Sequence, residues 1–287
     1  MRITGRTRLA GIMGWPVAHS RSPALHNFWI DEHGIDGVYV PLPVEPEQLE
    51  RALRALPALG FRGCNITLPH KEAALAIVDS VDPMARRIGA VNTIVVMPDG
   101  SLEASNTDAF GFRENLRESA PDWHPMDGAA VVLGAGGSAR AVTAALTELR
   151  VPEIRLVNRT LERAEALARD LGDAGTRITA HDWGSRGDVL GGAGLLVNTT
   201  SLGMSGAPEL EIDLSQLPLG ATVVDIVYVP LETPLLAAAR QRGNCTVDGL
   251  GMLLHQGRPG FEAWFGTPAR VTRELRAAVL TTLAAPR

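Results

Sequence analysis

Apolar residues in the first part of the chain occur in short runs that are separated by helical patterns. The expected elements are strands at residues 9–13, 38–44 and 61–68, with helices at 22–34 and 46–60. Short apolar runs that alternate with amphipathic segments are typical of α/β domains. The pattern therefore predicts an α/β fold for this part of the chain.

A second series of the same kind begins near Ala129. Its apolar runs are AAVVL, EIRLV, GLLVNTT and ATVVDIVY, and helical patterns occupy residues 139–149 and 161–171. This order predicts a Rossmann-like, doubly wound unit. The segment GFRENLRESAPDWHPMDG, at residues 111–128, is expected to connect the two series outside either sheet. After Gly249 the pattern is helical, and we expect this tail to pack on the first domain.

The length of 287 residues suits two domains with a cleft between them. We expect the first domain to comprise residues 1–108, completed by C-terminal helices at 250–287. The second is expected to comprise residues 109–249. This arrangement is typical of an enzyme that binds its ligands between two domains.

Composition and charge narrow the class of partner. Hydrophobic residues make up 45% of the chain, which allows a packed core, and the net charge of −5 offers no attraction to nucleic acid or anionic membranes. Cys64 and Cys245 fit neither a metal site nor a disulfide framework. Because no apolar stretch approaches the length of a bilayer span, we expect a cytoplasmic protein that binds a small molecule and no metal, with a homodimer left open.

The sequence VVLGAGGSARA carries the G-x-G-x-x-G/A pattern at Gly134, Gly136 and Ala139. It follows an apolar run and opens an alanine-rich helical segment, as this pattern requires. The glycines permit a tight turn and a close approach of pyrophosphate, and the small third residue lets helix and strand pack together. We therefore predict dinucleotide binding, rather than a turn without a ligand, at the whole segment Gly134, Ala135, Gly136, Gly137, Ser138 and Ala139.

The next apolar run ends at Asn158, where an NAD enzyme would commonly carry an acidic residue. Arg159 and Arg163 follow, and arginine can form charge-assisted bonds to a 2′-phosphate. The sequence therefore favours NADP(H) over NAD. The alternative is that both arginines are solvated, and Thr160 is expected to cap the next helix in either case.

Lys71 is the only lysine in the chain. A lysine ammonium can release its proton at a workable pH and an arginine cannot, so Lys71 is a candidate for proton transfer. Chance in an arginine-rich composition is the alternative. Asn65 and Thr67 precede it as alternate residues of an expected strand, so both can reach a hydroxylated ligand or, alternatively, brace the turn.

A set of motifs extends across nearly the whole chain: HSRSPALHN, NITLPHKEAA, GAVNT, NTDAFGF, GAGGSARA, NRT and GLGMLLHQG. In this order they resemble the shikimate dehydrogenase family. The resemblance implies an N-terminal α/β substrate-binding domain and a Rossmann-like NADP-binding domain. It also implies reversible, NADPH-dependent reduction of 3-dehydroshikimate to shikimate, a step of the shikimate pathway toward chorismate and the aromatic amino acids.

The resemblance further implies roles for single residues. Ser20 and Ser22 bind the substrate carboxylate, with Tyr228 nearby, and Lys71 forms the proton-transfer pair with Asp108. The residues that hold the ring hydroxyls are Asn65, Thr67, Asn92, Asp108 and Gln256. The cofactor-binding residues beyond the glycine turn are Asn158, Arg159, Thr160, Arg163, Thr199, Ile226 and Gly249. The alternative is that the two serines cap a helix and that Asp108 is an ordinary loop acid.

Some positions depart from the family or stay outside the predicted chemistry. Ile226 stands where a methionine often packs near the nicotinamide, and it can still supply an apolar contact. The histidines that flank the motifs are expected to be packed residues without a catalytic role; these are His19, His26, His70 and His255.

Three other functions stay open. The first is a quinate or quinate/shikimate dehydrogenase that uses NAD, against which the arginines and the paired serines argue. The second is a non-catalytic NADP-dependent sensor, which would not need both Lys71 and Asp108. The third, a nucleotide-binding domain with unrelated chemistry, would leave the N-terminal motifs unexplained.

Overall fold

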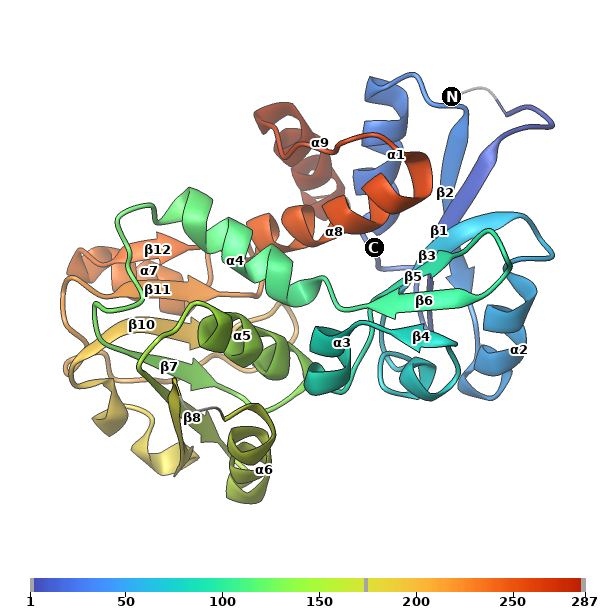
Figure 1. Ribbon diagram of the computed structural model, residues 1–287. Helices are drawn as coiled ribbons and strands as arrows, with labels where there is room; N and C mark the ends of the chain where they lie inside the picture. Colours follow the sequence, from blue (N-terminus) through green and yellow to red (C-terminus); the bar gives the residue numbers. More distant parts are fainter. Residues whose placement is uncertain (1–2, 173–174, 285–287) are drawn as a thin grey trace. The chain divides into compact units, whose positions relative to one another are not determined.

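The computed structural model describes residues 3–172 and 175–284. The chain divides into two compact units (Figure 1). One unit comprises the residues up to Thr107 together with those from Leu254 on, and the other runs from Asp108 to Leu253. Each unit is built on one six-stranded sheet. The predicted fold class, two α/β units of which one is Rossmann-like, is confirmed.

The first unit contains β1 (Arg8–Gly14), α1 (Ser22–Glu32), β2 (Gly37–Pro43), η1 (Pro46–Gln48), α2 (Leu49–Ala55), β3 (Phe61–Ile66), η2 (Ala73–Ala76), β4 (Ser80–Val81), α3 (Pro83–Ile88), β5 (Thr93–Val96), β6 (Leu102–Ser105), α9 (Arg273–Ala284) and the larger part of α8 (Gly249–Phe265). Its sheet has the strand order β2-β1-β3-β5-β6-β4. Strands β1, β2 and β3 are parallel, whereas β5 is antiparallel to β3 and β6. In this register Asn65 lies beside Ile12 on one side and Thr93 on the other, so it occupies the middle of the sheet.

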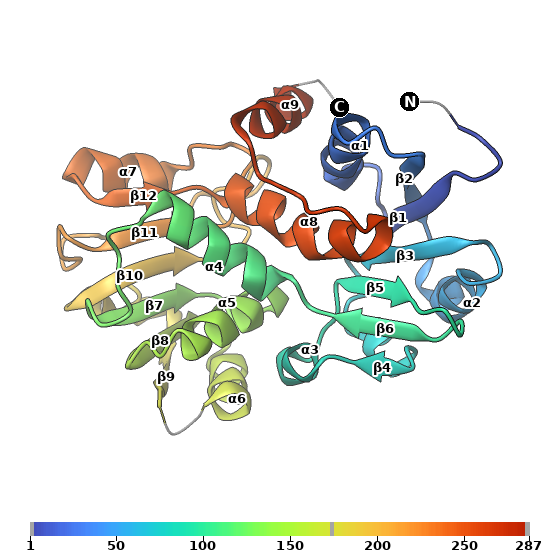
Figure 2. The same ribbon diagram turned by 45° about the horizontal axis from the view of Figure 1, so that its top comes forward.

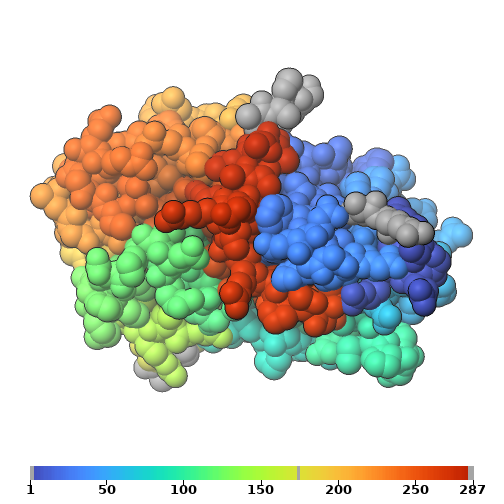
Figure 3. Space-filling model, turned by 90° about the horizontal axis from the view of Figure 1, so that it is seen from above, coloured from blue at the N-terminus to red at the C-terminus, as the bar shows by residue number. Residues whose placement is uncertain are grey.

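The C-terminal helices complete this unit against its N-terminal part. In Figure 3 the C-terminal segment lies against the N-terminal one, and α1 contacts α9. The indole of Trp29 on α1 donates a hydrogen bond to the Arg270 carbonyl at 2.8 Å, and its ring lies 5.1 Å from that of Phe261 on α8. The helical tail thus packs on the first part of the chain through buried aromatic contacts.

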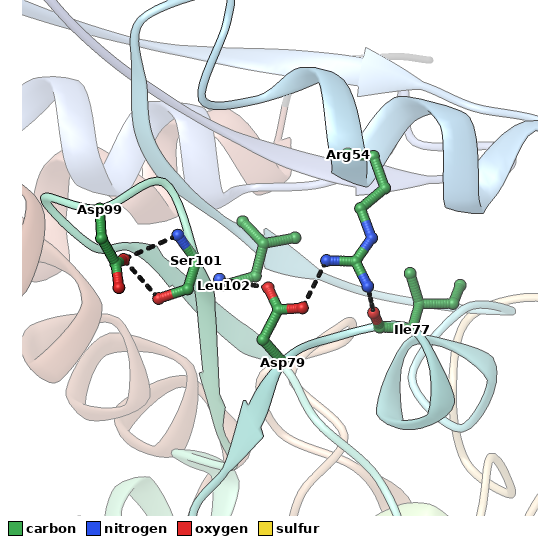
Figure 4. Close-up of polar contacts among 6 residues, drawn as sticks. All are labelled: Arg54, Ile77, Asp79, Asp99, Ser101 and Leu102. Carbon is green, nitrogen blue, oxygen red and sulfur yellow. Dashed lines mark hydrogen bonds and ion pairs between the residues drawn. The ribbon is translucent and has the colours of Figure 1, made fainter.

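A cluster of polar contacts links α2 to the segments around β4 and β6 (Figure 4). The Asp79 carboxylate accepts hydrogen bonds from the Arg54 guanidinium at 2.7 Å and from the Leu102 amide at 2.8 Å. These two donors, the backbone amide first, lower the pKa of Asp79. In the neighbouring turn Asp99 accepts from both the amide and the hydroxyl of Ser101. The cluster joins α2, the segment before β4 and the β5–β6 turn.

The second unit contains α4 (Asp108–Ser119), β7 (Ala129–Leu133), α5 (Gly137–Glu148), β8 (Glu153–Asn158), α6 (Leu161–Leu171), β9 (Arg177–Asp182), η3 (Trp183–Ser185), η4 (Asp188–Leu190), β10 (Ala193–Asn198), β11 (Thr222–Asp225), α7 (Pro234–Arg242), β12 (Cys245–Val247) and the start of α8. Its sheet has the order β12-β11-β10-β7-β8-β9, and every pair is parallel (Figure 2). All residues of β7 are buried, as expected of a central parallel strand that is covered on both faces.

The helices of this unit cover its sheet with apolar faces. Ala164, Leu167 and Leu171 are the buried residues of α6, and their spacing of three and four places them on one face of the helix. Neighbouring contacts link α4 to α5 and α5 to α6. A cluster that includes Leu133, Leu196 and Leu235 fills the space under α7. The glycine turn that follows Leu133 is therefore positioned by a packed core.

Residues 111–128 lie outside either sheet, as predicted, but the first part of this segment is helical. Residues 108–119 form α4, because Phe112 and Leu116, four residues apart, are buried together on one face. Only the segment after Ser119, rich in proline and aspartate, is the connection that the sequence predicted. Among the described residues, no helix is both long and apolar enough to cross a membrane.

Candidate active site

Polar side chains gather at the carboxyl end of β3 in the first unit. Asn65 is buried on β3, and Thr67 follows it, half-buried, with its amide bonded to the Met13 carbonyl at 3.0 Å. The next loop, which includes Lys71, is tied down because the Lys71 carbonyl accepts from the Val91 amide at 2.9 Å. Ligands of α/β sheets bind at such carboxyl ends, so the predicted position of these residues is suited to ligand binding.

Asn65 is held by three hydrogen bonds. Its amide nitrogen donates to the Asn92 carbonyl at 3.0 Å and to the Thr93 hydroxyl at 3.1 Å. Its oxygen accepts from the Tyr39 hydroxyl at 2.6 Å. Because all three partners are buried, the orientation of this carboxamide is fixed by the protein.

Asn92 is fixed in the same network. Its oxygen accepts from the Thr107 amide at 2.8 Å, from the Thr107 hydroxyl at 3.1 Å and from the Thr93 hydroxyl at 3.0 Å. Its amide nitrogen lies 3.5 Å from the Gln256 oxygen on α8. The structure thus brings Asn65, Asn92 and Gln256 together within the first unit. Asp108, the residue after Thr107, is buried at the start of α4.

The paired serines lie at the start of α1. Ser20 accepts a hydrogen bond from the Ser22 amide at 3.3 Å, and Ser22 is buried as the first residue of the helix. Arg21 is the N-cap residue, and it makes no side-chain capping bond. The Ser20 hydroxyl therefore binds the first amide of the helix, whereas Ser22 is a helical residue and not its cap.

Two of the flanking histidines are packing residues. His70 is buried with its Nε2 2.8 Å from the Val44 carbonyl, and the ring of His26 stacks on that of Tyr39 at 4.1 Å. Burial lowers the pKa of His26 to about 3, an effect that the Asn65 side chain partly offsets. A neutral imidazole suits this aromatic environment.

The glycine turn of the second unit has the geometry that its pattern predicted. Gly134 has a φ of +109°, and a Cβ there would come within 2.8 Å of the Thr199 hydroxyl. That hydroxyl donates to the Leu133 carbonyl at 2.6 Å. The turn can therefore close between β7 and β10 only with glycine at this position.

The start of α5 leaves room for an anion. Gly136 is the N-cap of the helix and Gly137 its first residue; both are exposed, and a Cβ on either would meet nothing within 4 Å. Ala139, fully buried, packs the helix on the sheet. The first amides of the helix can approach a phosphate without steric hindrance, so these residues fit a dinucleotide pyrophosphate.

The end of β8 carries the two exposed arginines. Asn158 is the last residue of the strand, and its amide donates to the Thr160 carbonyl at 2.8 Å, which shapes the turn that carries Arg159. Thr160 occupies the N-cap position of α6 but makes no side-chain capping bond, so the predicted cap by its hydroxyl is wrong. Arg159 and Arg163 are exposed next to this turn. The site presents positive charge where an adenosine ribose binds in this fold.

Sequence reasoning missed the buried carboxylate of Asp225, the residue before Ile226. Asp225 ends β11 and accepts hydrogen bonds from Asn198 at 3.0 Å, Thr233 at 2.7 Å and the Val227 amide at 3.0 Å. Burial raises the pKa of Asp225 to about 6, and these three donors oppose the shift. The network fixes the backbone of the segment that continues to Tyr228. An aspartate that closes an apolar run was the only sequence signal for it.

Gly249 lies against the same segment. A Cβ on Gly249 would overlap the Ile226 carbonyl, so glycine is required for this close approach. Thr199, Ile226 and Gly249, which the sequence assigned to cofactor binding, therefore all belong to the second unit together with the glycine turn. Their contact with a cofactor stays a prediction.

A parallel sheet with a glycine turn, an open helix N-terminus and an adjacent arginine pair defines the class of dinucleotide-binding α/β proteins. Residues 12–94 match the model of the shikimate dehydrogenase substrate binding domain, and residues 120–190 match that of shikimate / quinate 5-dehydrogenase. A curated shikimate dehydrogenase (NADP(+)) from Rhodospirillum rubrum is 63% identical over 279 residues, which cover 97% of this chain and 99% of the relative. The chain belongs to the shikimate dehydrogenase family.

Solved structures agree with this assignment. A shikimate 5-dehydrogenase from Thermus thermophilus, in complex with NADP(H) and shikimate, is 38% identical with a TM-score of 0.84 and covers 96% of this chain and 99% of its own. A quinate dehydrogenase from Corynebacterium glutamicum, in complex with NAD, is 33% identical with a TM-score of 0.88 over the same shares. The fold is therefore shared by enzymes that differ in substrate and cofactor.

Proposed function

We infer that this chain is an NADP-dependent shikimate dehydrogenase, which catalyses the reversible reduction of 3-dehydroshikimate to shikimate. The observation that carries this conclusion is the similarity to a curated relative of that name over nearly the full length of both chains. The reaction is a step of the shikimate pathway in the biosynthesis of aromatic amino acids. The dinucleotide-binding geometry of the second unit supports the same conclusion.

We propose that the substrate binds at the polar side chains of the first unit. Ser20 and Ser22 would donate hydrogen bonds to the carboxylate, with Tyr228 nearby. The ring hydroxyls would contact Asn65, Thr67, Asn92, Asp108 and Gln256. The shared hydrogen-bond network of Asn65, Asn92 and Gln256 supports this proposal, because pre-oriented amides bind hydroxyl groups at a small entropic cost.

Lys71 and Asp108 are proposed as the proton-transfer pair. NADPH supplies the hydride when it is bound. The Lys71 ammonium then gives its proton to the oxygen that forms from the substrate ketone, and in the reverse direction the neutral amine takes that proton from the hydroxyl. Asp108 orients Lys71 and the substrate hydroxyl as a hydrogen-bond acceptor. That Lys71 is the only lysine in a chain with many arginines supports this role, since arginine cannot exchange a proton at neutral pH.

The proposed cofactor site lies on the second unit. The amides of Gly136 and Gly137 would bind the pyrophosphate, and Arg159 with Arg163 would bind the 2′-phosphate. The remaining proposed contacts are Gly134, Ala135, Ser138, Ala139, Asn158, Thr160, Thr199, Ile226 and Gly249. The open space over Gly136 and Gly137 supports the first of these contacts. The exposure of both arginines, with no acidic side chain at position 158, supports the second.

We propose that residues 1–108 with 250–287 form the substrate domain and that residues 109–249 form the cofactor domain. The division of the chain next to residues 107 and 253 supports these bounds. A cytoplasmic location is proposed as well, because Cys64 and Cys245 are both free thiols. The homodimer considered from the sequence stays a prediction.

A panel of initial rates tests the proposed substrate and cofactor. Shikimate and quinate are each oxidised with NADP⁺ and with NAD⁺, and the absorbance of the reduced nicotinamide is followed. We expect shikimate with NADP⁺ to give the highest kcat/KM by at least about tenfold, because the 2′-phosphate adds charge-assisted hydrogen bonds. If quinate is oxidised faster than shikimate, or if NAD⁺ supports faster turnover than NADP⁺, the enzyme would instead be a quinate dehydrogenase or would use NAD, as the name of the Corynebacterium glutamicum structure indicates for that protein.

A further inference from the structure

Tyr39 is a buried tyrosine that none of the proposed substrate contacts includes. It lies in β2 with 1% of its surface exposed, and its ring lies 4.1 Å from that of His26 and 5.9 Å from that of Trp264. Its main chain is held on the other side by Asn27, whose side chain accepts from the Tyr39 amide at 3.0 Å and donates to its carbonyl at 2.9 Å. These contacts fix the ring and the backbone of Tyr39, and they therefore also fix the direction of its phenolic C–O bond.

The hydrogen bond between Tyr39 and Asn65 has only one possible direction. The Asn65 amide nitrogen faces the Asn92 carbonyl, which can only accept, so the Asn65 oxygen must face Tyr39. An amide oxygen cannot donate, and the Tyr39 hydroxyl is therefore the donor. Burial raises the pKa of Tyr39 well above its ordinary value, helped by Cys64 and partly offset by the Ser22 side chain. The hydroxyl consequently keeps its proton across the working pH range.

This network decides what Asn65 can offer to a ligand. The Asn65 amide has two hydrogens, and its nitrogen donates to Asn92 and to Thr93. The oxygen accepts one hydrogen bond from Tyr39 and has a second lone pair. Asn65 therefore meets a ligand as an acceptor, and the group that it binds must be a donor. A hydroxyl satisfies this requirement, whereas a keto or ether oxygen does not.

We propose that Tyr39 is a positioning residue for the substrate, whose hydroxyl holds the Asn65 carboxamide so that its oxygen receives a ring hydroxyl. This proposal rests on the shikimate dehydrogenase function inferred above. Tyr39 in β2 thus reaches past β1 to a proposed contact residue in β3, without being a contact itself.

The test is Tyr39→Phe, which keeps the aromatic ring and removes only the donor. We expect the KM for shikimate and its calorimetric dissociation constant to rise about tenfold, as for the loss of one buried hydrogen bond. The KM for NADP⁺ should stay within about twofold, because no residue of the second unit is changed. Thr93→Val, which removes another partner of Asn65, should raise the KM for shikimate as well and serves if Tyr39→Phe does not fold.

A double-mutant cycle separates positioning from general damage. In an Asn65→Ala background, Tyr39→Phe should change the dissociation constant of shikimate by less than about twofold, because its partner is gone. Trp29→Phe removes a different, partly buried hydrogen bond from the same aromatic cluster and should lower the melting temperature without changing the KM. Unchanged shikimate affinity in Tyr39→Phe, or additive effects in the cycle, would overturn the proposal. A wild-type enzyme without shikimate turnover would overturn the proposed function itself, and this inference with it.

Discussion

Replacing Lys71 with alanine should lower kcat for shikimate oxidation about a thousandfold, which is the usual contribution of a general acid or base. The KM for shikimate should change by less than about fivefold, since the proposed contacts of the ring hydroxyls with the carboxamides of Asn65, Asn92 and Gln256 would be retained. This split is expected when a lost interaction acts mainly in the transition state. Initial rates over a range of shikimate concentrations at saturating NADP⁺ measure both constants.

Lys71→Arg is the matched control. Arginine keeps the positive charge but cannot release a proton at neutral pH. If Lys71 transfers the proton, the arginine variant should be nearly as slow as the alanine variant. If Lys71 provides only positive charge, the arginine variant should recover most of the turnover, and the proton-transfer role would have to be abandoned.

Replacing Arg159 with alanine should raise the KM for NADP⁺ about thirtyfold, because a guanidinium that binds a phosphate forms charge-assisted hydrogen bonds of roughly 1.5 to 3 kcal/mol. The KM for NAD⁺, which lacks the 2′-phosphate, should be nearly unchanged. The preference for NADP⁺ should therefore decrease by the same factor. Steady-state rates with each cofactor at saturating shikimate give this ratio.

Arg169→Ala is the control for a general charge effect. Arg169 is exposed in the last turn of α6, the helix that follows Arg159. Removing it changes the net charge equally but should leave both cofactor constants within about twofold. An equal loss in the two variants would mean that the local field, rather than a bond from Arg159, favours NADP⁺.

The strands and helices that the sequence predicted best are those with one clear period. The strand AAVVL became β7, buried along its whole length, and the helix LERAEALARDL became α6 without a change in its bounds. The glycine turn between β7 and α5 was predictable because Gly134 needs a positive φ there. In such segments the local pattern and the tertiary structure require the same residues.

The sequence was less informative where a residue acts through a distant partner. Residues 111–119 were assigned to the connection and not to a helix, and only the packing of α4 on α5 reveals the role of Phe112 and Leu116. Asp225 and Tyr39 give a similar lesson. Asn65 is brought close to Tyr39 by the sheet and Thr233 close to Asp225 by the loop before α7, and one sequence without an alignment carries no pairing information.

The central claim is tested most directly by following the transferred hydrogen. NADPH that carries deuterium at both C4 positions is incubated with 3-dehydroshikimate and the enzyme, and the product is examined by mass spectrometry and NMR. The account predicts shikimate with one deuterium, bound to the carbon that was the ketone, in an amount equal to the NADP⁺ formed. Oxidation of NADPH without labelled shikimate, or no oxidation at all, would contradict it.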